Sequence, residues 1–221
     1  MMNKLAEHDK RVVWWEKSVE YTFIAEMVSK EMLMWVIPLA GNAESALSDA
    51  VLSWDDKLFL IEFKRDVESL KSERKKYTVA TNVEAQKIAY ENAKTTLAQY
   101  NGKNGHGLIF GEFDEEKLKL LAVPYWNNEK PLQADEWISN NGATPKDFDN
   151  YIKELCILRF AISGENGGAT GSRSFVVGVG KNGKNFTLEL DEYINLRPAL
   201  RNELIEAIEM NSEPETPRFN F

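Results

Sequence analysis

The stretch Asp49-Ala-Val-Leu-Ser-Trp-Asp-Asp-Lys-Leu-Phe-Leu-Ile-Glu-Phe-Lys64 decides the fold that this sequence predicts. Two alternating apolar runs, 50–54 and 58–63, flank a polar centre, a pattern typical of a β-hairpin. Pairing across a two- or four-residue loop would place Asp49 opposite Glu62. Side chains alternate along a strand, so Lys64 shares a face with both acids. The pattern therefore predicts two carboxylates and an ammonium group at the open end of one hairpin.

These charges indicate a cation site. Two carboxylates at cross-strand separation repel each other unless a cation lies between them or one of them takes up a proton. Hard oxygen ligands suit magnesium or calcium. We therefore expect a divalent cation between Asp49 and Glu62, with Lys64 beside it.

Asp49, a twelve-residue spacer and Glu62-Phe63-Lys64 resemble the core motif of the PD-(D/E)xK nuclease superfamily, which includes restriction enzymes, resolvases and RecB-like nucleases. The resemblance covers roughly residues 14–110. Ser48 stands where the superfamily usually has proline. Among the Asp/Glu-x-Lys triplets of the chain, Glu62–Lys64 alone ends an apolar strand with an aspartate at hairpin distance upstream; the others are 55–57, 73–75 and 115–117.

The resemblance implies an α/β fold with a restriction-endonuclease-like core, in which helices flank a mixed central sheet. We expect this core over residues 1–125 and a C-terminal α+β extension packed on it over 126–221. The implied activity is that of a metal-dependent nuclease that hydrolyses phosphodiester bonds in nucleic acid, with DNA as the expected substrate.

The resemblance also implies roles for single residues. Asp49, Glu62 and the carbonyl group of Phe63 would hold Mg²⁺ or Mn²⁺, and Lys64 would orient the attacking water. A helix before the first core strand often supplies a further acid in this superfamily. Glu20 is our first choice for that acid, ahead of Glu16 and Glu26.

Two further segments carry candidate substrate contacts. A helix is predicted over 82–100 with Asn82 as its cap, and its Gln86 and Tyr90 are similar to the Gln-x-x-x-Tyr motif of the RecB-like branch, which lies beside the metal. The charged segment 65–76 is expected to be a loop or a surface helix. Four of its cations are candidate phosphate contacts, which would control affinity rather than sequence choice: Lys71, Arg74, Lys75 and Lys76.

Hydrophobic periodicity predicts the remaining elements. We expect helices over 12–31, from Thr144 to about 160 and over 198–210, and strands over 32–39, 108–113, 117–125, 174–179 and 186–190, the last two forming a hairpin. His106 stands among glycines and is expected to be a loop residue, whereas Cys156 is expected in the core.

Composition limits the functions that are open. The 221 residues carry a formal net charge of −8, which argues against non-specific coating of nucleic acid. Residues 57–105 nevertheless hold ten Lys and Arg against six Asp and Glu, a local excess compatible with a phosphate-binding surface. A single cysteine excludes a disulfide framework, and the absence of a signal-peptide pattern or a membrane-spanning run makes the cytoplasm the expected location, with no membrane partner.

The sequence leaves three functions open. The first is the metal-dependent nuclease. The second is a catalytically silent nuclease-like fold that binds nucleic acid or protein, an alternative favoured by the acidic balance and by the lack of an evident DNA-binding appendage. The third is an unrelated α/β protein in which Asp49, Glu62 and Lys64 form a structural ion pair. Residues 111–221 could recognise substrate, form a homodimer or bind a partner protein.

Overall fold

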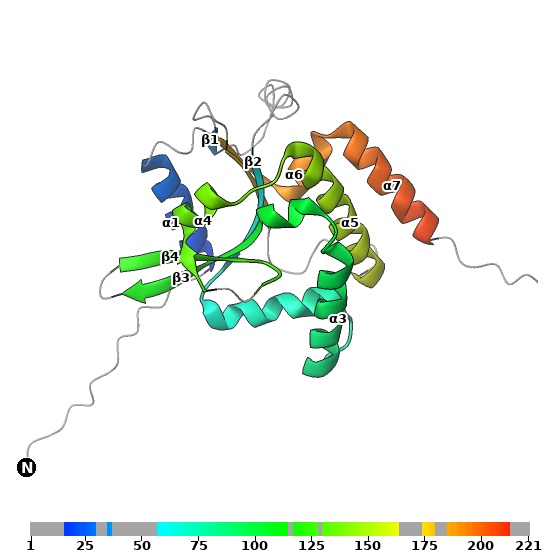
Figure 1. The fold of residues 1–221 in the computed structure, drawn as a ribbon, viewed down its shortest axis with the longest axis horizontal. Coiled ribbons are helices and arrows are strands. Elements are labelled where there is room, and N and C mark those ends of the chain that lie inside the picture. The colour runs from blue at the N-terminus through cyan, green and yellow to red at the C-terminus, as the bar shows by residue number, and fades with distance from the viewer. Residues whose placement is uncertain are drawn as a thin grey trace, which may run out of the picture.

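The structure, a computed structural model, describes residues 16–29, 35–36, 57–114, 117–127, 130–163, 174–179 and 185–212, and it has an α/β fold in which helices flank a mixed sheet (Figure 1). The strands lie in the order β1-β7-β6-β2-β3-β4-β5. Their bounds are Trp35–Val36 (β1), Lys57–Lys64 (β2), His106–Asp114 (β3), Lys117–Pro124 (β4), Leu132–Gln133 (β5), Ser174–Val179 (β6) and Asn185–Glu189 (β7). The helical elements are α1 (Glu16–Ser29), η1 (Val67–Tyr77), α3 (Val83–Leu97), η2 (Asn101–Gly105), α4 (Ala134–Asn140), α5 (Pro145–Ser163), α6 (Leu190–Asn195) and α7 (Pro198–Ser212).

Strand β2 lies inside the sheet, with a neighbour on each edge. It pairs parallel with β3 and antiparallel with β6. Leu58, Leu60 and Glu62 lie opposite residues of β6, and Leu58 also forms a bridge with Ala143 through two backbone hydrogen bonds of 2.8 and 3.0 Å. The predicted antiparallel partner of these positions, residues 50–54, is therefore wrong. The local alternation correctly indicated a strand, but it carried no information about which distant strand pairs with it.

The chain between β2 and β3 forms a crossover connection that contains the predicted helix over 82–100. Parallel strands need such a connection, and helix α3 supplies most of it. The side chain of Asn82 accepts a hydrogen bond of 2.7 Å from the backbone N–H of Ala85, so the predicted cap is confirmed. Ala93 and Leu97 are buried against the sheet side of the helix, whereas Ile88 is 53% exposed.

The two faces of the sheet bury different apolar clusters. Helices α1 and α4 cover one face, and α3, α5, α7 and η1 cover the other (Figure 1). Phe59, Ile61 and Phe63 point into the first cluster, whereas Leu58 and Leu60 point into the second. Because side chains alternate along β2, Glu62 and Lys64 lie on the second face, at the end of an otherwise apolar strand.

The segment predicted as a C-terminal extension contributes to the sheet itself. Strands β6 and β7 form the predicted hairpin, and β6 is the antiparallel neighbour of β2. Residues 126–221 therefore do more than pack on a finished core, because they complete the sheet around the candidate motif. None of the helices in the described part of the chain is long and apolar enough to cross a membrane.

Candidate functional site

Glu62 and Lys64 belong to a buried group of charged side chains, which we call the charge cluster. They share a face at the end of β2, as predicted, and they are 0% and 2% exposed. The other members come from η1 and α5: Glu73, Lys76 and Arg159. Asp49, the remaining acid of the predicted motif, lies outside the described residues.

Both oxygens of the Glu62 carboxylate contact a cation. Nη2 of Arg159 donates to Oε1 over 2.8 Å, and the Lys76 ammonium contacts Oε2. The hydroxyl group of Ser174 also donates to Oε1, over 3.2 Å. Burial alone would raise the pKa of Glu62, but Arg159 and Lys76 outweigh it and hold this pKa well below its usual range. Glu62 is therefore a carboxylate anion at neutral pH.

Glu73 is the second buried acid of the cluster. Its Oε1 lies 2.7 Å from Nζ of Lys64, and its Oε2 lies 2.8 Å from Nζ of Lys76. Tyr125 donates its hydroxyl proton to the same Oε2 over 2.8 Å. Burial and the neighbouring charge of Glu62 raise the pKa of Glu73. Burial opposes the charge on Lys64, but Glu73 outweighs it, so the pKa of Lys64 is raised and this side chain stays cationic.

Aromatic side chains enclose the cluster and fix its arginine. The hydroxyl groups of Tyr77 and Tyr125 are 3.0 Å apart, and each accepts a hydrogen bond of 3.2 Å from Nη2 of Arg159. The ring of His106 stacks on that of Tyr125, with 3.7 Å between their centroids. Arg159 is thus oriented by two tyrosines as well as by the Glu62 carboxylate.

His106 is fully buried in β3, so its predicted place in a loop is wrong. Its Nδ1 lies 2.5 Å from the hydroxyl group of Tyr151, which also accepts a hydrogen bond of 2.7 Å from Nε1 of Trp126. The tyrosine proton is then free to point to Nδ1, an arrangement in which the imidazole proton lies on Nε2. Nε2 faces Oε1 of Glu62 from 3.6 Å, beyond hydrogen-bond reach, and makes no hydrogen bond with the described residues. Burial lowers the pKa of His106 to about 4, so the ring is neutral at pH 7.

Helix α1 brings a different acid to Lys64 from the one expected. Glu20 is 8% exposed and forms an ion pair with Lys17 at 2.6 Å. Oε1 of Glu16, one turn earlier, lies 3.8 Å from Nζ of Lys64, and partial burial raises the pKa of Glu16. The structure therefore favours Glu16 over Glu20 as the acid from this helix that approaches the motif.

The Gln86 and Tyr90 pair has structural partners. Nε2 of Gln86 donates to the carbonyl groups of Ala80 and Thr81, over 3.1 and 3.2 Å, which holds the loop before α3. The hydroxyl group of Tyr90 donates to the carbonyl group of Tyr125. The two side chains bind separate backbone groups, although Tyr90 packs close to the cluster through its ring contacts with the tyrosines.

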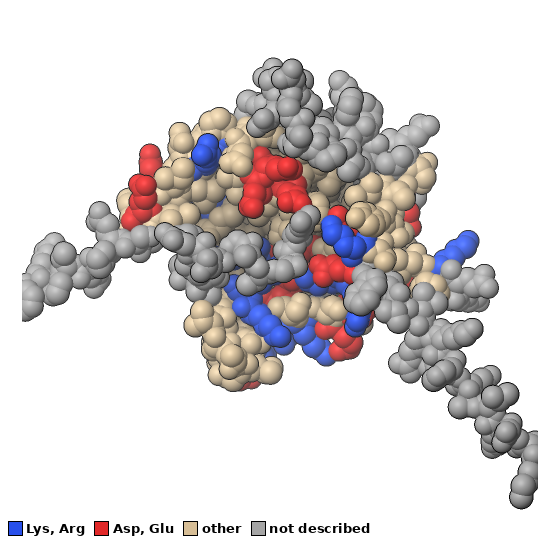
Figure 2. Space-filling view, turned by 180° about the vertical axis from the view of Figure 1, so that it is seen from behind, with Lys and Arg blue, Asp and Glu red and all other residues tan. Residues whose placement is uncertain are grey.

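The predicted phosphate contacts on η1 divide into two groups. Lys75 is exposed and Arg74 is half-buried, whereas the Lys76 side chain is only 11% exposed and points into the charge cluster. Figure 2 shows Lys and Arg side chains gathered in the lower middle of the molecule, with acidic side chains among them. Lys76 therefore neutralises carboxylates of its own chain, and Arg74 and Lys75 remain as candidate contacts for a ligand.

The cluster holds some of the donors that a divalent cation needs. Glu62 and Glu73 supply the carboxylate oxygens that Mg²⁺ and Mn²⁺ prefer, and they already share one cation, the Lys76 ammonium. Over the described ranges, no group of three or more His, Cys, Asp or Glu side chains is placed to hold a metal ion. The carboxylate oxygens of Glu62 and Glu73 are the type of ligand that a hard cation prefers, but the ammonium of Lys76 fills the space between them.

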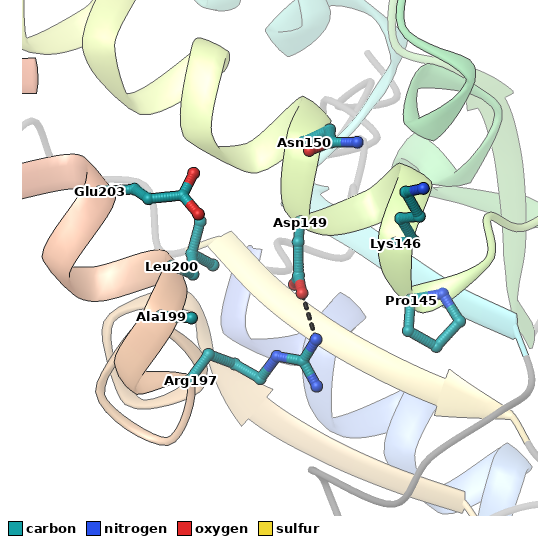
Figure 3. Close-up of a pocket in the computed structure, with 8 residues that line it drawn as sticks. All are labelled: Pro145, Lys146, Asp149, Asn150, Arg197, Ala199, Leu200 and Glu203. Atoms are coloured by element: carbon teal, nitrogen blue, oxygen red, sulfur yellow. Dashed lines mark hydrogen bonds and ion pairs between the residues drawn. The ribbon is translucent and has the colours of Figure 1, made fainter.

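A separate pocket of about 370 Å³ lies between α5 and α7 (Figure 3). Arg197 points across it to Asp149 and forms an ion pair, and the hydroxyl group of Tyr193 donates to Asp149 over 2.7 Å. The pocket shares no residue with the charge cluster. Glu203, also in the lining, forms an ion pair of 2.9 Å with Lys153, which lies outside it.

Sequence reasoning missed Glu73, His106 and Arg159 as members of the site. Glu73 and Lys76 stand three residues apart, a spacing at which helical side chains meet, and this was the available signal. Arg159 gave none, because only the tertiary fold brings α5 to the end of β2.

Comparison with known protein families, with curated proteins and with solved structures finds no match to this chain. The class that the described residues define is an α/β protein with a mixed sheet flanked by helices. The geometry of the charge cluster is therefore the basis for inferring a function.

Proposed function

We propose that this chain is a metal-dependent nuclease that hydrolyses phosphodiester bonds in nucleic acid, with DNA as the expected substrate. The observation that carries the proposal is the arrangement of Glu62 and Lys64. A carboxylate held in its anionic form and a cationic lysine lie together on one face, at the end of an apolar strand inside the sheet. Charged groups are costly to bury, and a concentration of them on a central strand is typical of functional sites.

Each residue would have a definite part in this chemistry. Glu62 would hold Mg²⁺ or Mn²⁺ together with Asp49 and the Phe63 carbonyl group, and the bound ion would supply a water of lowered pKa and offset charge on the scissile phosphate. Lys64 is kept cationic by Glu73, so it would stabilise negative charge that develops on the phosphate. Arg74 and Lys75 would hold the nucleic-acid backbone without reading its sequence.

One observation favours the second candidate, a catalytically silent nuclease-like fold that binds nucleic acid or protein. Both Glu62 oxygens already bind cations of the chain, and the side chain is 0% exposed. A carboxylate neutralised in this way can serve a purely structural role. The two candidates differ in whether Glu62 exchanges its lysine for a metal ion.

Cleavage assays on plasmid and single-stranded DNA, with Mg²⁺ or Mn²⁺, test the proposal. We expect the wild type to cleave and Asp49→Ala, Glu62→Gln and Lys64→Met to lose activity by about 100-fold or more. Glu68→Gln is the matched control, because Glu68 lies on η1 with its side chain 74% exposed. Far-UV circular dichroism would verify that each variant is folded.

Two outcomes would count against the nuclease. Cleavage that persists in both Asp49→Ala and Glu62→Gln would exclude this site. A wild type that binds DNA but cleaves none with either metal would establish the silent fold instead.

A further inference from the structure

The loop between η1 and α3, residues 78–82, exposes apolar side chains to solvent. Val79 is 83% exposed, more than any other large apolar side chain in the described part of the chain, and Val83 at the start of α3 is 70% exposed. Each Å² of apolar surface left in water forgoes about 25 cal/mol of burial free energy. Single exposed apolar side chains are common on protein surfaces, so the surroundings of this pair decide what it means.

Three polar side chains fix the backbone of this loop. Oγ1 of Thr78 accepts a hydrogen bond of 3.1 Å from the N–H of Ala80, and Asn82 caps α3. Gln86 is 9% exposed, and its Nε2 donates to the carbonyl groups of Ala80 and Thr81. The two valines are therefore held in place, and a β-branched side chain has few rotamers to lose. Contact with a ligand would cost little conformational entropy.

Cations without an ion pair lie on both sides of the loop. Among the described residues of η1 and α3 these are Arg74, Lys75 and Lys87, and the corresponding acid is Glu84. The other cations of these two elements are in ion pairs with acids of the chain: Lys71, Lys76 and Lys94. Three positive charges thus face one negative charge around the loop, although the whole chain is acidic.

The apolar and the cationic groups belong to one surface. Val83 and Lys87 lie one turn apart on α3 and share a face of that helix. Lys75 lies in the last turn of η1, and Val79 follows it four residues later. The elements η1 and α3 pack against each other. We call this set the loop surface: Arg74, Lys75, Val79, Val83 and Lys87.

The loop surface suits a ligand that carries repeated negative charges and exposes apolar faces. Charge complementarity favours a nucleic-acid backbone, whose phosphates contact lysine and arginine side chains. A duplex stacks its bases inside, so it offers such a surface mainly its backbone. A single strand also exposes the faces of its bases, which pack on apolar side chains. The combination of cations and exposed valines therefore favours a single strand.

We propose that the loop surface binds single-stranded nucleic acid. Its cations contact phosphates, and Val79 and Val83 contact the faces of unstacked bases. This inference rests on the proposed function, since it takes the ligand to be nucleic acid, and it adds the class of substrate. Every base has a face of this kind, so the valines bind without selecting a sequence.

Fluorescence anisotropy in EDTA, with a labelled oligothymidylate and a duplex of the same length, tests the inference without cleavage. The wild type is expected to bind the single strand more tightly than the duplex. Val79→Ser and Val83→Ser should each weaken binding of the single strand by about threefold to tenfold and leave binding of the duplex unchanged. Val67→Ser is the matched control, because Val67 is 53% exposed at the other end of η1. Equal affinity of these three variants for oligothymidylate would overturn the inference, as would tighter binding of the duplex by the wild type.

The salt dependence of binding separates the two kinds of contact. The logarithm of the affinity for a single strand falls with the logarithm of the salt concentration by about 0.7 for each neutralised phosphate. Lys75→Gln and Lys87→Gln should each lower this slope by about that amount, whereas Val79→Ser should leave it unchanged. A slope that falls in Val79→Ser but not in the two lysine variants would refute the assigned roles.

The outcomes distinguish this inference from the nuclease proposal. If DNA is cleaved but the two valine variants bind and cleave as the wild type does, the nuclease stands and the loop surface is refuted. If the single strand binds through the valines and no DNA is cleaved with Mg²⁺ or Mn²⁺, the loop surface stands and the nuclease fails. A wild type that binds neither form of DNA overturns the inference and favours a protein as the partner of this loop.

Discussion

His106 should make the folded state sensitive to pH between 7 and 5. The ring is fully buried between Tyr125 and Tyr151, and burial lowers its pKa to about 4, although the negative charge of Glu62 acts in the opposite sense. The nearby cations Arg159 and Lys76 lower the pKa further. An unfolded chain has a histidine pKa of about 6.5. Acid therefore protonates the unfolded chain before the folded one.

The sign and the size of the effect follow from proton linkage. A folded pKa below the unfolded value gives stability that is present above the unfolded pKa and lost as the pH falls toward the folded pKa. With pKa values of about 6.5 and about 4, the unfolded chain binds nearly one more proton at pH 5. The corresponding loss between pH 7 and pH 5 is about 2 kcal/mol in the free energy of unfolding.

Urea denaturation at pH 7 and pH 5 measures this loss, and the histidine content of the chain supplies the control. The chain has two histidines, His8 and His106. We expect His106→Gln to be less stable than the wild type at pH 7, because it loses the stacking on Tyr125. This variant should not show the loss in the free energy of unfolding between pH 7 and pH 5 that His106 causes. His8→Gln should show that loss in full.

The loss of stability is compared between the wild type and His106→Gln, because Glu73 acts on the stability in the opposite sense. Its raised pKa lets the folded state bind a proton first, which stabilises the fold as the pH falls. That contribution is present in both wild type and His106→Gln and cancels to first order. The reasoning is refuted if His106→Gln loses as much stability as the wild type between pH 7 and pH 5, or if NMR shows His106 titrating near 6.5 in the folded chain.

Three further predictions concern stability, and equilibrium urea unfolding measures each. Arg159→Met should cost about 3–5 kcal/mol, because it leaves the buried carboxylate of Glu62 with one cation fewer; a loss below 1 kcal/mol would show that the pair is dispensable. Gly107→Ala should cost about 1–3 kcal/mol or more, since the added methyl group would lie 2.5 Å from the ring of Trp137; an unchanged stability would mean that the indole moves freely. Asn82→Ala should cost about 1 kcal/mol through loss of the cap of α3, and no loss would contradict the capping role.

Elements with local signals could be predicted from the sequence. The cap at Asn82 and the Thr144-Pro145 start identified α3 and α5, because capping residues act within one turn. The β6–β7 hairpin was predictable for the same reason, since its strands are separated by a short connection. In each case the residues that determine the element are close together in the chain.

The partner of β2 could not be predicted in this way. Its antiparallel neighbour β6 is distant in sequence, and two apolar runs close in the chain formed the simpler pair. The glycines before and at the start of β3 were misleading for a different reason. A Cβ at Gly102 would lie 2.3 Å from Cβ of Tyr151, and the methyl group at Gly107 would meet an indole ring. These glycines reflect close packing, whereas the sequence pattern indicated a turn, and His106 was therefore assigned to a loop.

Two adjacent carboxylates repel each other unless a cation lies between them, and in the described structure a lysine of the chain lies between two of them. Glu73 stands as the second acid and Lys76 as the cation. Glu16 is a third acid beside the cluster, 3.8 Å from Lys64, so three cations face three carboxylates, and only the tertiary fold brings their three helical elements to the end of β2.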